Sequence, residues 1–405
     1  MKSLTAAAVG LIAATGAAAQ IVPSLPGVPA LPGAIDRLGG LVDRTVDGVR
    51  TLPPRALAAA RIERIADLVR TSGGRIALDD QGLPARAGEV VLTDPTEAQI
   101  ATLVAQGFHL IAREQVGDLG VGYARFAVPA GARLDRVLST TRALVPGVAA
   151  DTLSFQAGAS GAAASPISQA GAAGGATIGM IDGGVGPAVA GVRQMGFADG
   201  APRASDHGTA VASLIAGGGR VKGAAPGAHI LAADVYGSDP AGGSAVGIAR
   251  AIGWLAKERV ATVAISLVGP AHPLVARTVA AAQTRGMILV AAVGNDGPAA
   301  PPAYPASYPG VVAVTAVDGR GRVLLESGRA SHLDYAAPGA DMIALDARGR
   351  ARTVRGTSYA VPLVAGSIAR MRTAGDWRGA LETTAKRGRG YGRGLVCADC
   401  ATRRF

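Results

Sequence analysis

The sequence predicts a protein of two parts, in which a small α+β unit precedes a larger α/β domain built on a parallel sheet. Between residues 87 and 156, strand and helix patterns follow one another in the order β-α-β-β-α-β. After residue 175, continuous apolar runs alternate with helical segments, which is typical of strands buried on both faces of a parallel sheet. A stretch of Gly, Ala and Ser separates the two regions.

The composition is that of a globular protein and limits the classes of partner. The chain has 405 residues, of which 49% are hydrophobic and 17% charged, so it is long enough for two ordinary domains and is not of the disordered type. Its net charge is +11, but the basic residues are spread along the chain and aromatic residues make up only 3%. Because basic stripes and stacking aromatics are both lacking, we expect no nucleic-acid partner.

Residues 1–19 predict a secretory signal peptide. Lys2 supplies a positive charge, residues 4–14 are apolar, and the alanines at 17–19 suit cleavage after Ala19. An ordinary N-terminal helix is the alternative. No later apolar run reaches the length of a membrane span without interruption. We therefore expect an extracytoplasmic protein, secreted or periplasmic, that is a monomer and has no membrane span.

The elements of the first part follow in order. Residues 20–86 begin with a stretch spaced by Pro and Gly and continue into a helix over 54–71, where apolar residues recur at helical spacing. The next patterns are strands at 88–94, 108–116, 121–129 and 148–156, with helices at 95–107 and 132–144. This order is that of a split βαβ, ferredoxin-like unit. Residues 157–174 have no side chains to build a core, so they are expected to be a linker that is open to proteolysis.

The second part, residues 175–396, carries the parallel sheet. Its predicted strands are 176–182, 229–236, 260–268, 286–294 and 311–317. Functional groups of such sheets gather beyond the carboxyl ends of the strands. This is where the candidate catalytic residues are expected.

Four polar residues occupy such positions. Asp182 closes a strand, His207 begins an Ala-rich helix, Asn295 follows another strand, and Ser358 precedes an apolar helix. Each alone has an ordinary explanation: a turn for Asp182 and Asn295, a helix start for His207, and a helix N-cap for Ser358. Together, Asp, His and Ser appear in the chain order of one of the known serine-protease triads.

The chemistry of acyl transfer needs these residue types. A serine hydroxyl is a weak nucleophile, so an imidazole must take its proton as it attacks a carbonyl. A carboxylate orients the imidazole and stabilises the imidazolium that forms. A side-chain amide donates a hydrogen bond to the oxyanion of the tetrahedral intermediate. The four residues therefore predict acyl-transfer chemistry, in which Ser358 attacks a carbonyl carbon.

The segments around these residues resemble the motifs of the subtilisin-like serine proteases, the subtilase family. The similar segments are IDGGV, HGTAVASLIAG, AAVGNDG and GTSYAVPLVAG. The resemblance covers about 175–396 and implies a subtilisin-like fold with a mostly parallel central sheet. It implies a secreted serine endopeptidase in which Asp182, His207 and Ser358 are the triad and Asn295 is the oxyanion donor. The substrates would be polypeptides.

The resemblance also assigns roles to the flanking regions. It implies that residues 87–156 are an inhibitory propeptide, which occupies the active-site cleft of a zymogen until it is cleaved off, and that 20–86 are a pro-segment. The residues implied to pair with an extended substrate are Ser266, Leu267, Val268 and Gly269. The opposite wall of the S1 pocket is implied to be Ala292, Val293 and Gly294. Val268 stands where the family often has glycine, which adds bulk beside this pocket.

No metal or cofactor is expected. Residues 217–219 are glycines, where many relatives carry a loop that binds calcium, and glycines offer only backbone oxygens. Cys397 and Cys400 lie in the C-terminal tail, 397–405, and a zinc site would need further ligands. A local disulfide between them is the prediction.

Two alternatives to a general protease remain. One is a processing protease of narrow specificity, with which Val268 is compatible. The other is a catalytically silent binding module with the same fold. The presence of all four catalytic residue types, Asp182, His207, Asn295 and Ser358, argues against the silent module.

Overall fold

The structure is a computed structural model that describes residues 54–156, 158–166, 175–372, 375–400 and 402. The predicted signal peptide, 1–19, and the segment that follows it to residue 53 lie outside the described residues, as does 167–174 of the predicted linker. Within the described ranges, no helix has both the length and the apolar character needed to cross a membrane.

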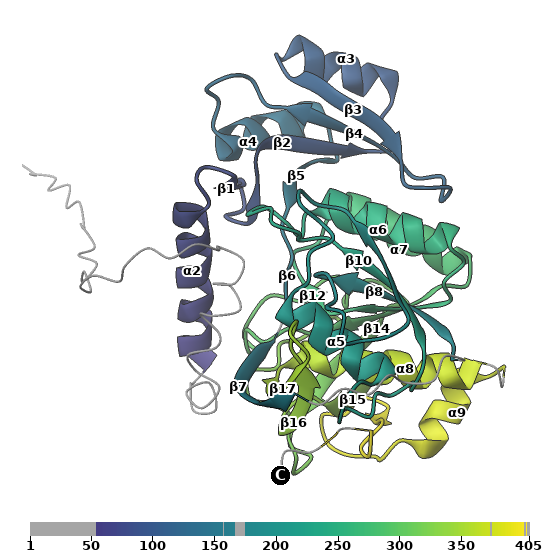
Figure 1. The fold of residues 1–405 in the computed structure, drawn as a ribbon. Helices are drawn as coiled ribbons and strands as arrows, with labels where there is room; N and C mark the ends of the chain where they lie inside the picture. The colour runs from purple at the N-terminus through teal and green to yellow at the C-terminus, as the bar shows by residue number, and fades with distance from the viewer. Residues whose placement is uncertain (1–53, 157, 167–174, 373–374, 401, 403–405) are drawn as a thin grey trace, which may run out of the picture. The chain divides into compact units, whose positions relative to one another are not determined.

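The larger domain is built on an eight-stranded sheet whose neighbouring strands are all parallel (Figure 1). The strand order across the sheet is β18-β15-β14-β13-β11-β8-β10-β9. The bounds are β8 Thr177–Asp182, β9 Val192–Gly196, β10 His229–Asp234, β11 Thr262–Ile265, β13 Ile288–Ala292, β14 Val312–Val317, β15 Tyr335–Pro338 and β18 Gly394–Leu395. The strands β9, β15 and β18 were not among those that the sequence patterns predicted.

Helices cover both faces of this sheet (Figure 1). The first face carries α5 (Asp206–Ala216) and α8 (Val361–Met371), and the second carries α6 (Ala245–Lys257) and α7 (Pro273–Thr284). Because successive side chains of a strand point to opposite faces, Met180 packs in the first core and Ile181 in the second. This two-sided burial explains the continuous apolar runs and confirms the predicted α/β architecture.

The smaller unit contains β2 (Pro84–Thr93), α3 (Glu97–Ala105), β3 (His109–Gln115), β4 (Gly122–Ala127), α4 (Leu134–Leu144) and β5 (Val148–Thr152). Its antiparallel sheet has the order β5-β2-β4-β3, and β1 (Ile76–Leu78) pairs with the start of β2. Leu103 of α3 and Leu138 of α4 pack on one face against Phe126. On the other face Val91 and Tyr123 belong to the core that α6 and α7 share. The unit has the predicted ferredoxin-like order of elements.

The predicted strand over 148–156 is divided. After β5 the chain leaves the sheet, and β6 (Phe155–Gln156) pairs antiparallel with β12 (Leu267–Val268) of the larger domain. The backbone N–H groups of Leu153 and Ser154 mark the change, because they donate to Pro84 O and Gly243 O respectively. The single strand predicted over 148–156 is therefore wrong, since its two ends find different partners.

The predicted strand over 260–268 is divided in the same way, between β11 and β12. Ser266 lies at the break, where its hydroxyl donates to Ser358 O at 2.9 Å and its carbonyl accepts from Ser358 Oγ at 3.1 Å. The apolar run continues through the break, so its pattern does not reveal the change of partner.

A three-stranded sheet lies beside this region. It consists of β16 (Met342–Leu345), β17 (Arg350–Arg355) and β7 (Ala159–Pro166), and each neighbouring pair is antiparallel. The strand β7 falls within the segment that was expected to be a linker. Its residues, ASGAAASP, have no apolar alternation, so the strand is visible only through its backbone pairing.

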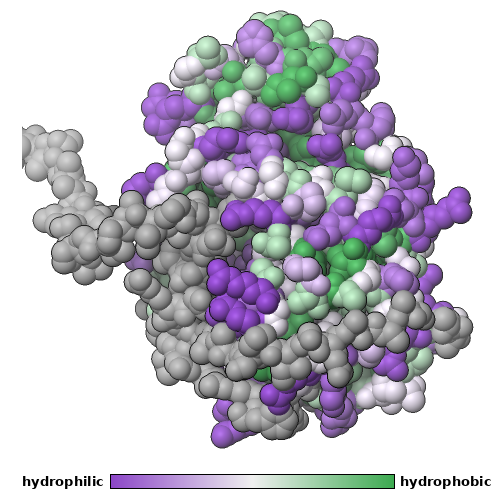
Figure 2. Space-filling model, in the orientation of Figure 1, coloured by the Kyte–Doolittle hydropathy of each residue, from purple (hydrophilic) through white to green (hydrophobic). Residues whose placement is uncertain are grey.

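The surface is mixed in character. Figure 2 shows polar and charged side chains spread between small apolar ones, with an apolar patch over α3 and β3 near the top of the view. Val104, Leu110 and Ile111 are exposed in these two elements.

The first helix, α2 (Pro54–Thr71), covers the range predicted for it, and its Leu57 is buried while Ile62 is exposed.

His272 joins the two units and yields a pH-dependent prediction. It is the N-cap of α7, where Nδ1 accepts from Leu274 N, and Nε2 donates to Ala150 O of β5 at 3.0 Å. Burial, aided by the charge of Arg142, lowers the pKa of His272 from 6.5 to about 4. Between these values the unfolded chain binds a proton that the folded chain does not, so the contribution to stability is complete above pH 6.5 and is lost towards pH 4.

We therefore predict that a His272→Asn variant, which keeps a capping side chain, lacks this pH dependence. The free energy of unfolding of the parent should fall relative to the variant by up to about 3 kcal/mol between pH 6.5 and pH 4. Denaturant unfolding in a Ser358→Ala background, which keeps the chain intact, measures the difference. A difference that stays constant over this range would show that His272 does not titrate in this way.

Candidate active site

Asp182 and His207 form a buried hydrogen-bonded pair. Asp182 is the last residue of β8, and His207 is the second residue of α5, whose N-cap Ser205 accepts from Gly208 N. The imidazole Nδ1 lies 2.9 Å from Asp182 Oδ1 and 3.0 Å from Oδ2. The strand end and the capped helix start therefore fix both side chains.

The surroundings of Asp182 define which imidazole nitrogen carries the proton. Asp182 Oδ1 also accepts from Gly183 N at 2.7 Å and from Gln156 Nε2 at 2.9 Å. An oxygen that accepts from several N–H donors is that of an ionised carboxylate, so His207 Nδ1 is the protonated nitrogen. Nε2 is buried without a hydrogen-bond partner among the described residues. It is thus available to accept a proton.

A second aspartate lies beside Asp182 and was not singled out from the sequence. Asp234 ends β10 and stands opposite Asp182 in the parallel pairing. Burial raises the pKa of Asp234, and the negative charge of Asp182 adds to this effect. Its carboxylate accepts from the backbone N–H groups of Arg203, Tyr236 and Gly237. Asp234 therefore stabilises the turn beyond β10, and Tyr236 from this turn donates to Ser154 O.

Ser358 lies in a 3₁₀ turn, Thr357–Tyr359, that leads into α8. It is fully buried, and the N-cap of α8 is Ala360, which makes no side-chain cap. The Ser358 hydroxyl therefore does not cap the helix but donates to Ser266 O. The ring of Tyr359 packs on the imidazole of His207 with 5.2 Å between the ring centroids, so the serine turn and the histidine helix meet at this contact.

Asn295 lies beyond β13 and is held by the serine turn. Its Oδ1 accepts from Thr357 N at 3.0 Å. Because the side-chain oxygen is engaged, its amide nitrogen is the part left to donate to a ligand at the site. Gly294 before it has a φ of +86°, a conformation that favours glycine, and this turn brings Asn295 to the site.

A buried ion pair connects the same two segments. Arg355 ends β17, three residues before Ser358, and Glu326 precedes the strand β15. Arg355 Nε lies 2.6 Å from Glu326 Oε1, and Nη2 donates to Oε2 at 2.9 Å. The two residues are 8% and 2% exposed. Since Glu326 O accepts from Gly297 N, the pair connects the serine turn to the loop that carries Asn295.

The residues implied to bind substrate lie together. Leu267 and Val268 pair with Gln156 and Phe155. A Cβ added to Gly294 would lie 3.5 Å from Cγ1 of Val268 and 3.6 Å from its Cγ2. The segment 266–269 and the segment 292–294 are therefore adjacent.

The chain itself runs through this region as an extended segment. Ser154 is bound between two backbones, because its N–H donates to Gly243 O and an added Cβ on Gly269 would meet its hydroxyl. The segment continues as β6 against β12, Gly158 lies against Tyr359, and β7 then pairs with β17. Residue 157 lies outside the described residues. The described parts of the segment thus flank the serine turn on both sides.

The helix α2 lies against the loop that follows Asn295. Arg61 Nε lies 3.2 Å from Asp296 Oδ2, and Arg64 pairs with the other carboxylate oxygen. Leu57 lies against Gly297. The N-terminal helix therefore covers the loop next to the candidate oxyanion donor.

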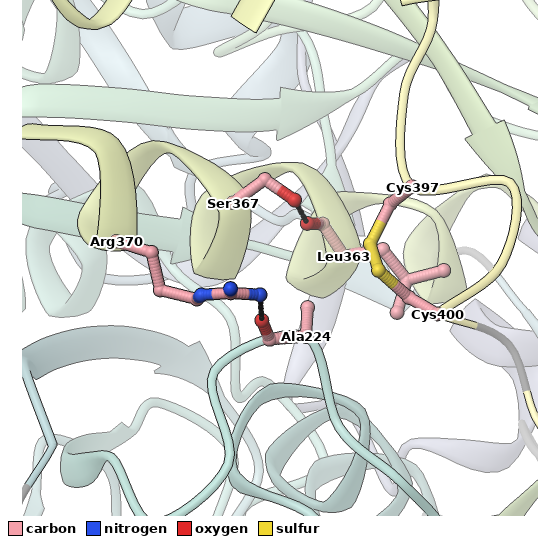
Figure 3. Close-up of a disulfide and its surroundings, with 6 residues drawn as sticks. All are labelled: Ala224, Leu363, Ser367, Arg370, Cys397 and Cys400. Carbon is pink, nitrogen blue, oxygen red and sulfur yellow. Dashed lines mark hydrogen bonds between the residues drawn. A yellow bond between two sulfur atoms is a disulfide. The ribbon is translucent and has the colours of Figure 1, made fainter. Parts of the chain in front are cut away.

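The two cysteines form a disulfide next to α8. Cys397 and Cys400 are bonded, with their Cα atoms 5.1 Å apart, and they pack against the core that contains Leu363 (Figure 3). Further along α8, Arg370 donates to Ala224 O (Figure 3). Both contacts lie on the helix that follows Ser358 and secure its position.

Comparison with known proteins gives consistent similarities. A family model described as the subtilase family matches residues 192–390, which include His207, Asn295 and Ser358. M-protease of Shouchella clausii strain KSM-K16 is 34% identical over 224 residues, 51% of this chain and 58% of that relative. Subtilisin BL of Lederbergia lenta is 34% identical over 223 residues, 51% of this chain and 82% of that relative.

A solved structure has a similar fold. Fervidolysin of Fervidobacterium pennivorans, described as a keratinolytic enzyme related to subtilisin, superposes with a TM-score of 0.65 at 18% identity. The match covers 82% of this chain and 63% of that one. The predicted subtilisin-like fold is confirmed, and the chain spans less than two thirds of the length of fervidolysin and of M-protease.

The buried ion pair yields a stability prediction. Removing one partner of such a pair leaves an uncompensated buried charge. We expect Arg355→Met to lower the free energy of unfolding by about 3–5 kcal/mol, as measured by denaturant unfolding in a Ser358→Ala background. The second substitution Glu326→Leu should recover much of this loss, because it removes the unpaired charge.

The control is the exposed pair of Arg113 and Glu97. Arg113→Met should cost less than about 1 kcal/mol, because solvent screens the pair. Equal effects of Arg355→Met and Arg113→Met would contradict the importance of the buried pair.

Proposed function

Because the chain belongs to the subtilase family of serine proteases, we propose that it is a serine endopeptidase made as a zymogen that cleaves its own N-terminal part. The observation that carries this proposal is the extended segment beside the serine turn. Its part before residue 157 pairs with Leu267 and Val268, and its part after Gly158 pairs with β17. A protease binds a polypeptide substrate in such an extended form, by adding it as a strand.

The proposed mechanism starts with the proton of Ser358. His207 Nε2 accepts it as Ser358 Oγ attacks the carbonyl carbon, and Asp182 stabilises the resulting imidazolium through Nδ1–H. The amide of Asn295 donates to the oxyanion. His207 then protonates the leaving amine, and water hydrolyses the acyl-enzyme by the reverse sequence of proton transfers.

In the proposed zymogen, residues 87–156 act as an intramolecular inhibitor, and 20–86 form a further pro-segment. Gln156 donates to Asp182, and Ser358 Oγ donates to Ser266 O. Helix α2 adds a second cover through the pairs of Arg61 and Arg64 with Asp296. Cleavage within about 154–165 would release both covers from the catalytic domain.

Location and substrates follow from the same proposal. A signal peptide over 1–19 directs the chain out of the cytoplasm, to the periplasm or the medium, where it acts as a monomer on polypeptides.

A processing protease of narrow specificity is the second candidate. Val268 favours it, because this side chain lies against Gly294 and narrows the space beside the pocket. A silent binding module has no such supporting observation.

Purification of the full chain beside Ser358→Ala tests the proposal. The wild type should cut itself between residues 154 and 165 and react covalently with a fluorophosphonate, whereas the variant should do neither. Electrophoresis, mass spectrometry of the products and a labelled probe provide the readouts. A wild type that stays at full length and also remains unlabelled by the probe would overturn the enzyme assignment.

A second prediction concerns the oxyanion donor. Asn295→Ala removes one hydrogen-bond donor from the transition state, and loss of the equivalent kind of donor in subtilisin lowers kcat by roughly 10²–10³. We expect a fall of this order in kcat on a chromogenic peptide, with KM little changed. The control is the activated Asn295→Asp variant, whose side chain keeps the size of asparagine but presents hydrogen-bond acceptors in place of the amide donor. A kcat for Asn295→Ala within about twofold of the wild type would exclude the role.

A further inference from the structure

Tyr359 occupies the space beside the nucleophile and has no role in the mechanism above. It directly follows Ser358, is only 1% exposed, and lies with its ring on the imidazole of His207. Its ring is therefore fixed between the serine turn and the catalytic base.

The chain's own segment passes the ring with a glycine. A Cβ added to Gly158 would lie 2.5 Å from Tyr359 Cε2, 2.9 Å from Cζ and 3.1 Å from the hydroxyl oxygen. Non-bonded carbon atoms are normally about 3.5–4.0 Å apart, so any side chain at this position would clash. The ring of Tyr359 therefore leaves room only for a glycine here.

The ring cannot move aside without cost. Protein interiors are close-packed, and Tyr359 is buried with its ring against the imidazole of His207. A shift large enough to admit a Cβ would also displace the imidazole. A larger residue at position 158 therefore disturbs the catalytic base as well as its own binding.

Gly158 is the first described residue after the strand that pairs with β12. The strand β6 ends at Gln156, whose side chain is bound to Asp182, and β7 begins at Ala159. Between them, Gly158 is the residue that contacts the neighbour of Ser358. We take the bond that precedes Gly158 as the one that Ser358 attacks, which makes Gly158 the first residue of the C-terminal product.

We propose that Tyr359 is a specificity-determining residue that selects glycine immediately after the cleaved bond, in this chain and in its polypeptide substrates. The proposal rests on the proposed endopeptidase function and names its substrate class. Water hydrolyses the bond between residues 157 and 158, so the products carry a new carboxylate at Ala157 and a new amine at Gly158.

The first test uses the full chain with Gly158→Ala. We expect cleavage before residue 158 to be at least roughly tenfold slower than in the wild type, or to move to another bond. The time course on gels and the N-terminal sequence of the product measure rate and position. Cleavage of Gly158→Ala at the same bond and at the wild-type rate would overturn the proposal.

The second test uses the activated enzyme and two peptides that differ only in Gly or Ala after the cleaved bond. Wild type should prefer the glycine peptide by about tenfold or more in kcat/KM. Tyr359→Phe, the matched control, keeps the ring and should keep the preference. Tyr359→Ala removes the ring and should bring the ratio close to one, and in the full chain it should restore cleavage of Gly158→Ala.

The outcomes separate the two proposals. If wild type reacts with a fluorophosphonate and cleaves both peptides equally well, the selection by Tyr359 is wrong while the endopeptidase function stands. If wild type neither reacts nor cleaves, the endopeptidase function fails and the selection fails with it. Because the comparison of the two peptides needs only the wild type, the test does not depend on the folding of Tyr359→Ala.

Discussion

The site depends on the buried hydrogen bonds between Asp182 and His207. A carboxylate with no exposure is unfavourable unless it is well paired, and Asp182 accepts from Gly183 N, Gln156 Nε2 and the imidazole. The strand end that presents Asp182 and the capped helix that presents His207 must both be in place for this pairing. The parallel sheet and α5 are therefore needed for the tautomer of His207 as much as for the fold.

Much of the candidate site could be predicted from local sequence patterns. Asp182, His207, Asn295 and Ser358 follow strands or begin helices with clear apolar periodicity, so both their places and their shared edge were predictable. The division of the predicted strand over 260–268 at Ser266 could not be predicted, because it depends on hydrogen bonds to Ser358, which lies 92 residues away. Polar pairs between residues far apart in the chain leave no recognisable pattern in the sequence. The pair of Arg355 and Glu326 could not be predicted for the same reason.

Small residues set a second limit on prediction. The segment 159–166 contains only Ala, Ser, Gly and Pro, so no side-chain alternation distinguishes its strand from a linker. The pairing comes entirely from backbone groups of β17. Tyr359 shows the opposite case, since an aromatic residue after the nucleophile is evident in the sequence, but its meaning depends on the ring's contact with Gly158.

The pairing of β7 with β17 has a consequence for the proposed self-cleavage. A cut before Gly158 leaves residues 158–174 covalently attached to β8, so this product strand stays tethered at a local concentration in the millimolar range. Under the proposed mechanism, incoming substrates would then compete for β17 with the new N-terminus that the cut creates. Turnover would be governed by how often this tethered product detaches, and shortening the tether or removing it by a second cut would change the apparent KM without altering any catalytic residue.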